Sequence, residues 1–213
     1  SCGRFRHSKI IPSLQILPLG PTGYGDSPYQ SVSTFAGNPY FIDLETLIDK
    51  KLLTKEECES CDWGGSESYV DYEKMYLSRY KLLRKAYERA DLKNDPDYMV
   101  FLKKEKDWLL DYCLFMAIKN AQNGKCWIDW PEELKDRHSK AVKEAEKELA
   151  EEVGFYSFQQ YCFTTQWNKL KEYANEKGIQ IIGDVPIYVA LDSSDAWANP
   201  EMLQFDEDYN PKA

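Results

Sequence analysis

Two short apolar segments, separated by a long stretch of helical sequence, constrain the fold of this chain most. The first covers residues 15–19. The second covers residues 179–183 and follows a helical segment that ends at Gly178. Short apolar runs bounded by turn residues are typical of buried strands. Two strands joined through helices pair in parallel, because a parallel pair needs a long crossover connection. The sequence therefore predicts adjacent or near-adjacent parallel strands whose carboxyl ends lie at one edge.

Asp184 directly follows the second predicted strand. A helix, a glycine, a buried strand and then a polar residue form the order of elements in a βα-barrel, where the chemistry lies at the carboxyl ends of the strands. A helix cap or a loop salt bridge remains an alternative role for Asp184. The helical sequence from about 46 to 152 is too long for one βα connection, so we interpret it as a helical insertion.

The helical region carries its own start signals. Thr54 and Glu57 have the spacing of a capping box, and Asp95-Pro96 fits an N-cap followed by proline in the first turn. Between them, large side chains recur every three or four positions, which predicts one helix face buried in a core. A platform that stacks sugars is the alternative for this face. Its residues are Tyr69, Tyr72, Tyr76, Tyr80, Leu83 and Tyr87.

A loop rich in glycine and proline follows the first predicted strand. It holds Tyr24, Asp26, Ser27 and Tyr29 within residues 20–30. Tyrosine rings stack on the C–H faces of pyranoses, and short polar side chains bind hydroxyls, so this loop suits sugar recognition. A structural turn with tyrosines in the core is the alternative. Asp26 can also brace the loop through an Asx turn.

Charge and hydropathy exclude several classes of partner. The net charge of −9 disfavours non-specific binding to nucleic acid and to anionic membranes. No apolar stretch reaches the roughly 18 residues of a membrane span, and residues 1–13 lack the apolar core of a signal peptide. These features predict a cytoplasmic protein.

The cysteines do not form a recognisable metal or disulfide pattern. The chain has six cysteines and two histidines, without the spacing of a disulfide framework. Cys58 and Cys61 have no second cysteine pair, and His7 and His138 cannot complete a credible zinc site. The acidic run 206–208 lacks the glycine and the spacing of a calcium loop. The sequence therefore predicts reduced thiols and no metal site.

Two long motifs in this chain resemble one known family. Residues 20–40, GPTGYGDSPYQSVSTFAGNPY, resemble the signature loop of 4-α-glucanotransferases, also called amylomaltases or disproportionating enzymes. Residues 178–210 resemble the next barrel strand and following loop of that family, and the segment between also fits. The resemblance implies an α/β fold: a partial (β/α)8 TIM-like barrel with a large helical insertion, dominated by helices. It divides the chain into an atypical leader (1–13), a barrel strand and substrate loop (14–45), a helical insertion subdomain (46–152), and a barrel helix, strand and following loop (153–213).

The resemblance implies roles for five residues. Tyr29 resembles the tyrosine that stacks on the sugar before the scissile bond, and Ser27 a position that contacts substrate. Tyr24 resembles a tyrosine of a secondary glucan-binding groove. Asp184 resembles an aspartate that supports the site near the point of cleavage without being the nucleophile. Asp26, in the same loop, is the fifth substrate-binding candidate.

The same resemblance implies a reaction. The family transfers α-1,4-glucan segments between maltooligosaccharide, starch or glycogen chains by a retaining double displacement, and this reaction needs no cofactor. The family's nucleophilic Asp, in an Arg-x-Asp-His type motif, and its acid/base Glu have no match here and are expected beyond Ala213. Leu14 stands where the family usually has Trp, and residues 1–13 do not match the family's start. The chain thus resembles an internal fragment that we expect to be inactive alone.

Two other classes of function stay open. One is a non-catalytic carbohydrate-binding module, and the other is a helical interaction protein. A glycine-rich substrate loop together with an aspartate at a strand end favours the enzyme family over both.

Overall fold

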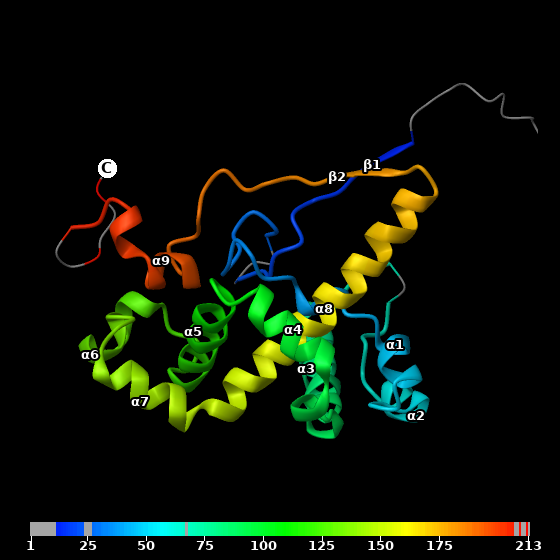
Figure 1. Ribbon diagram of the computed structural model, residues 1–213, viewed down its shortest axis with the longest axis horizontal. Helices are drawn as coiled ribbons and strands as arrows, with labels where there is room; N and C mark the ends of the chain where they lie inside the picture. The colour runs from blue at the N-terminus through cyan, green and yellow to red at the C-terminus, as the bar shows by residue number, and fades with distance from the viewer. Residues whose placement is uncertain (1–11, 24–26, 67, 207–208, 210–211, 213) are drawn as a thin grey trace, which may run out of the picture.

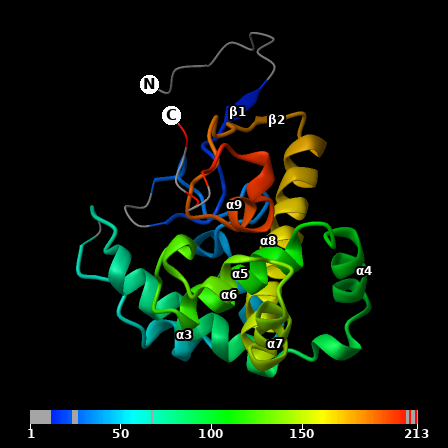
Figure 2. The same ribbon diagram turned by 90° about the vertical axis from the view of Figure 1, so that its left-hand side faces the viewer.

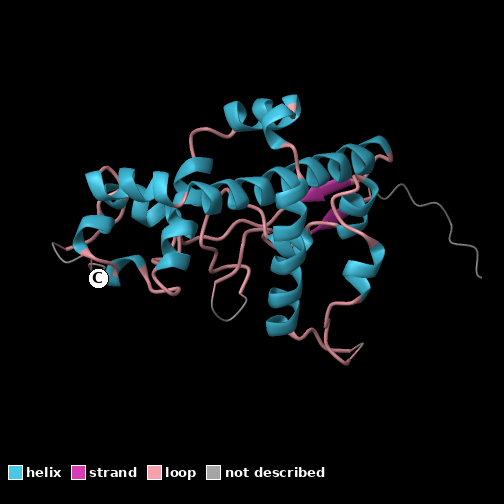
Figure 3. Ribbon diagram, turned by 90° about the horizontal axis from the view of Figure 1, so that it is seen from below, coloured by secondary structure: helices cyan, strands magenta, loops and turns pink. Residues whose placement is uncertain are grey.

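The computed structural model of the chain is helix-rich with a small parallel sheet (Figures 1 and 3). It describes residues 12–23, 27–66, 68–206, 209 and 212. The helices and strands are β1 (Ser13–Gln15), α1 (Leu44–Asp49), α2 (Lys55–Glu59), α3 (Tyr72–Arg89), α4 (Pro96–Lys104), α5 (Leu109–Ala121), α6 (Glu132–Lys135), α7 (Lys140–Glu148), α8 (Ala150–Glu176), β2 (Gln180–Ile182) and α9 (Ser194–Ala198). Short 3-10 turns cover Pro39–Phe41, Leu92–Asn94, Trp127–Asp129 and Pro200–Met202.

The two strands pair in parallel, as the sequence predicts. Ser13 lies opposite Gln180, and the N–H of Ile16 donates to the carbonyl of Ile182 at 2.9 Å. The predicted bounds are wrong, because the first strand covers 13–15 rather than 15–19. Pro18 has no N–H to donate to a ladder, and the pairing ends before it.

The predicted burial of these strands is also wrong. Leu14 is 54% exposed and Ile182 is 50% exposed. A two-stranded sheet shields its faces only where other elements pack on it, and in the described part of the chain α8 is the main element against β2. The two strands therefore join the start of the described chain to the segment that follows α8, without forming a core.

Helix α8 contributes side chains to both hydrophobic cores of the molecule. Figure 1 shows it running diagonally from α7 up to the sheet. On one side Tyr156 and Tyr161 join a core with α5 and α9. On the other side Phe155 and Phe158 join a core with α1 and α3. Gly178 has φ +71°, a conformation that glycine adopts without strain, and it turns the chain from α8 into β2.

The helix start signals behave as predicted. The Thr54 side chain accepts from the N–H of Glu57, and the Glu57 carboxylate accepts from the N–H of Thr54, which completes the capping box of α2. Asp95 caps α4 through two backbone N–H groups, and Pro96 occupies its first turn.

The predicted tyrosine face is only partly buried. Leu83 is fully buried, but Tyr69 lies before α3 and is 82% exposed, and Tyr72 and Tyr76 are close to half exposed. The buried residues of α3 lie from Ser78 onward, so only the later turns of the helix reach the core. The prediction of one continuous core face is therefore wrong for the first turns.

Within the described residues, no helix combines the length and the apolar character needed to cross a bilayer.

Candidate functional site

The loop of residues 20–36 is closed at its base by contacts with its own chain. The N–H of Asn38 donates to the carbonyl of Leu19 at 2.8 Å. Gly20 has no space for a side chain, because a Cβ there would lie 2.4 Å from Oγ of Ser31. A glycine is therefore needed where the two sides of the loop approach each other.

Helix α9 holds the same loop from the other end of the chain (Figure 2). The N–H of Ser194 donates to the carbonyl of Val32 at 2.9 Å. The N–H of Thr34 donates to a carboxylate oxygen of Asp195, also at 2.9 Å. The segment after β2 and the loop after β1 are thus fixed to each other.

Tyr29 and Asp184 meet at the centre of this arrangement. The phenol of Tyr29 donates to Oδ2 of Asp184 at 2.9 Å, and Oδ1 of Asp184 accepts from the N–H of Val185 at 2.9 Å. The parallel arrangement predicts that these two side chains lie at the same end, and the hydrogen bond confirms it. Tyr29 is 46% exposed, so part of its ring remains available to a ligand.

The hydrogen bond to Asp184 raises the pKa of Tyr29 above its usual value. A raised pKa keeps the phenol protonated at neutral pH and through the usual tyrosine range near about 10. The phenol therefore remains a donor to Asp184 across that range, and it loses its proton as the pH rises through the raised pKa.

A cavity of about 760 Å³ opens beside Tyr29. Its wall contains the ion pair of Lys119 Nζ with Asp192 Oδ2 at 2.5 Å. Tyr188 also lines a smaller cavity of about 160 Å³, which Asp184 borders. Rings and hydrogen-bonding groups on one wall suit ligands with apolar faces and many hydroxyls. The polar and aromatic residues of the larger cavity are Ser27, Tyr29, Gln30, Lys119, Tyr188 and Asp192.

Three of the five predicted site residues gather here, namely Ser27, Tyr29 and Asp184. Tyr24 and Asp26 lie outside the described residues. Sequence reasoning did not single out Lys119, Tyr188 or Asp192. Lys119 lies inside α5 with no local signal. Tyr188 and Asp192 follow Asp184 closely, and this nearness along the chain was the one signal available for them.

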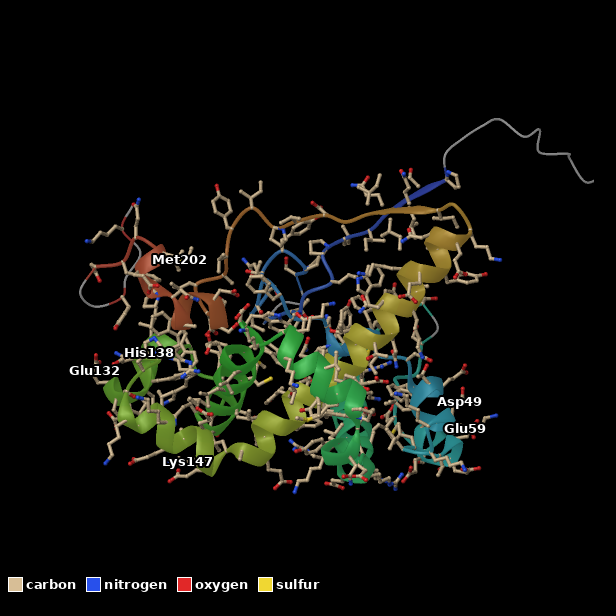
Figure 4. All side chains as sticks on the ribbon, in the orientation of Figure 1. Asp49, Glu59, Glu132, His138, Lys147 and Met202 are labelled. Atoms are coloured by element: carbon tan, nitrogen blue, oxygen red, sulfur yellow. The ribbon has the colours of Figure 1, made fainter. Side chains whose placement is uncertain are left out.

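Cys58 and Cys61 are partly buried and pack against the core that α1 and α3 share. Burial raises the pKa of Cys58, and the neighbouring Cys61 and Glu57 add to this effect. A raised pKa disfavours the thiolate that a metal needs. His138 lies at the α6–α7 end of the molecule, across from Glu59 and the rest of α2 (Figure 4). Among the described residues, no three His, Cys, Asp or Glu side chains gather where they could hold a metal.

We therefore expect the protein to bind no stoichiometric zinc. Native mass spectrometry after purification without a chelator should give the mass of the bare polypeptide. The double variant Cys58→Ser/Cys61→Ser should show the same metal content as the original chain. One zinc per chain, lost in that variant, would contradict the prediction.

The comparisons with known proteins agree on one family. A family model described as "4-alpha-glucanotransferase" matches residues 4–209. The chain is 48% identical over 189 residues to the 4-alpha-glucanotransferase of Clostridium butyricum, which covers 89% of this chain and 39% of that protein. It is 46% identical over 201 residues to that of Thermus thermophilus, covering 92% of this chain and 39% of the relative.

The solved structures give the same picture. An amylomaltase from Streptococcus agalactiae in complex with acarbose superposes with a TM-score of 0.88 at 38% identity, covering 94% of this chain and 41% of the other. An amylomaltase from Corynebacterium glutamicum, 16% identical, has a TM-score of 0.65, covers 86% of this chain and 26% of the other, and shares the fold. The chain spans about two fifths of the length of the curated relatives it matches.

Proposed function

Since the chain belongs to the family of 4-alpha-glucanotransferases, we propose that it supplies the glucan-binding loop of an enzyme that transfers α-1,4-glucan segments between chains. Its partners are α-1,4-glucans and maltooligosaccharides, in starch or glycogen. The observation that carries the proposal is the contact between Tyr29 and Asp184 beside a cavity that Ser27 also lines. In this proposal Tyr29 stacks on a sugar ring, Ser27 binds a hydroxyl, and Asp184 orients both. Tyr24 and Asp26 are proposed as further substrate-binding residues of the same loop.

We further propose that β1 and β2 are two strands of a partial (β/α)8 barrel. Their parallel pairing and the helix α8 before β2 support this reading. Residues 14–45 and 153–213 are then barrel elements, and residues 46–152 are an insertion between them. The free cysteines among the described residues accord with a reducing, cytoplasmic location.

The retaining mechanism needs two carboxyl groups about 5–5.5 Å apart across the scissile bond. The carboxylates that border the described cavities have other contacts: Asp184 accepts from Tyr29, and Asp192 is paired with Lys119. We therefore propose that this chain binds glucan and orients it, and that it does not itself supply the nucleophile or the acid/base. Exclusion of water by stacked sugars would then favour transfer to another glucan over hydrolysis.

The test is to measure binding and transfer separately on the purified chain. We expect isothermal titration calorimetry to detect binding of maltoheptaose, and we expect no glucose or longer oligosaccharides after incubation with maltotriose. The Asp184→Asn variant serves as the control for contaminating enzymes. Disproportionation that is lost in Asp184→Asn would show that the chain carries catalytic groups. Absence of any maltoheptaose binding would overturn the proposed function.

The non-catalytic binding module remains the second candidate, because the same cavity could serve it. A hybrid enzyme, in which this chain is joined to the unmatched remainder of a relative, distinguishes the binding module from part of an active site. A hybrid with the C-terminal part of the Clostridium butyricum enzyme should disproportionate maltotriose if the loop belongs to an active site.

A further inference from the structure

Two glutamines of α8 make the same kind of contact with the segment that follows the loop. Oε1 of Gln160 accepts from the N–H of Gly37 at 2.7 Å, and its Nε2 donates to the carbonyl of Gly37 at 2.9 Å. Oε1 of Gln166 accepts from the N–H of Asp43 at 2.7 Å, and its Nε2 donates to the carbonyl of Asp43 at 3.1 Å. Each side-chain amide thus satisfies both backbone groups of one residue, as a neighbouring strand would.

The two contacts differ in what they hold. Gly37 ends the loop that carries Ser27 and Tyr29. Asp43 instead caps the N-terminus of α1, where it accepts from the N–H groups of two residues of that helix. The first contact therefore anchors the loop, and the second anchors a helix outside it.

The first contact is also more enclosed. Gln160 is fully buried, whereas Asp43 is exposed. Gly37 lies against α8 so closely that a Cβ there would be 2.0 Å from the ring of Phe163. Gly37 is buried as well, and a buried N–H or carbonyl without a partner is costly. Removal of the amide is thus expected to loosen the contact between Gly37 and α8.

We propose that Gln160 is a positioning residue for sugar binding, an inference that rests on the proposed function. Gln160 lines neither the cavity beside Tyr29 nor the one that Asp184 borders, so it does not act by touching a ligand there. It fixes the end of the loop against α8, the helix that leads directly into β2 and Asp184. The position of Tyr29 relative to Asp184 therefore depends on Gln160, and recognition sites tolerate only small displacements of this kind.

The experiment compares Gln160→Leu with the matched variant Gln166→Leu. Both remove a two-way amide contact, and Gln160→Leu also removes the contact of Gln160 with the buried Tyr112 hydroxyl. Both are expected to lower the midpoint of thermal unfolding, Gln160→Leu by more. Only Gln160→Leu is expected to raise the Kd for maltoheptaose, by about tenfold, and to speed amide hydrogen exchange in residues 27–37. Equal changes in Kd and in loop exchange for the two variants would overturn the proposal.

A second variant keeps the proposal testable if Gln160→Leu does not fold. In Gln160→Glu a protonated carboxyl offers one donor and one acceptor, like the amide, and burial favours that neutral form. Binding by this variant should recover as the pH falls, while binding by the original chain should not improve. A parallel pH dependence for both proteins would overturn the proposal.

The outcomes also separate this inference from the proposed function. If the original chain binds no maltoheptaose, the proposed function fails. Faster loop exchange in Gln160→Leu alone would then still support its role in holding the loop, and unchanged exchange would overturn that role.

Discussion

Replacing Trp197 with alanine is expected to lower the free energy of unfolding by about 3–5 kcal/mol, the cost of emptying a large buried site. Trp197 is fully buried in α9. Its ring lies 5.9 Å from the rings of both Phe115 and Trp130, and its indole N–H donates to the carbonyl of Leu134 at 3.0 Å. The substitution leaves a cavity and an unpaired carbonyl at once. Urea unfolding followed by far-ultraviolet circular dichroism measures the loss.

Two controls make this prediction specific. Trp63 is 37% exposed, and its indole N–H donates to the carbonyl of Cys58 at 2.9 Å, so Trp63→Ala should cost clearly less than Trp197→Ala. Trp197→Phe fills most of the space but loses the hydrogen bond to Leu134. Its loss in the free energy of unfolding should lie between those of Trp63→Ala and Trp197→Ala. A loss for Trp197→Ala no larger than that for Trp63→Ala would contradict the assignment of Trp197 to the core.

The second large effect concerns Tyr29. In the proposed function, Tyr29→Ala removes a ring that stacks on sugar, worth about 1–3 kcal/mol, or roughly five- to 150-fold in Kd for maltotriose. In an enzyme carrying these residues the same variant should lower turnover, because the proposed function puts the ring beside the scissile bond, where charge develops. Calorimetry on this chain and kinetics on a full-length hybrid measure the two losses.

Matched variants assign the loss to the ring or to the hydroxyl. Tyr29→Phe keeps the ring and removes only the hydrogen bond to Asp184, so its Kd should rise less than that of Tyr29→Ala. Tyr24→Ala should affect long or cyclic glucans more than maltotriose, because the resemblance places Tyr24 in a remote groove. Equal loss of turnover on maltotriose for Tyr24→Ala and Tyr29→Ala would argue against this division.

The pairing of β1 with β2 could be predicted from sequence because it follows from topology. A parallel pair needs a long crossover connection, and the helical sequence between the two apolar segments supplies one. Burial was not predictable in the same way, since it depends on which other elements pack on the sheet. Leu14 and Ile182 have the apolar side chains of core strands, and yet both are half exposed.

The same distinction holds for the site. Ser27, Tyr29 and Asp184 could be identified because each lies in a local motif next to a strand end. Lys119 and Asp192 meet through the packing of α5 against the segment before α9, and no local pattern marks that contact. The bond between Gln160 and Gly37 is equally non-local, and a glutamine inside a helix carries no signal that it will hold a loop.

The pairing of Ser13 with Gln180 closes a loop of nearly the whole described chain. In a flexible chain the entropy of closing such a loop grows slowly, by about 0.6 kcal/mol for each doubling of its length, but a sheet of two exposed strands has little energy to offset it. The folded helices between the strands reduce this cost, because α8 ends directly at β2 and the contact of Gln160 with Gly37 ties the start of the chain to α8. The stability of the sheet therefore depends on the packing of the helices between its two strands.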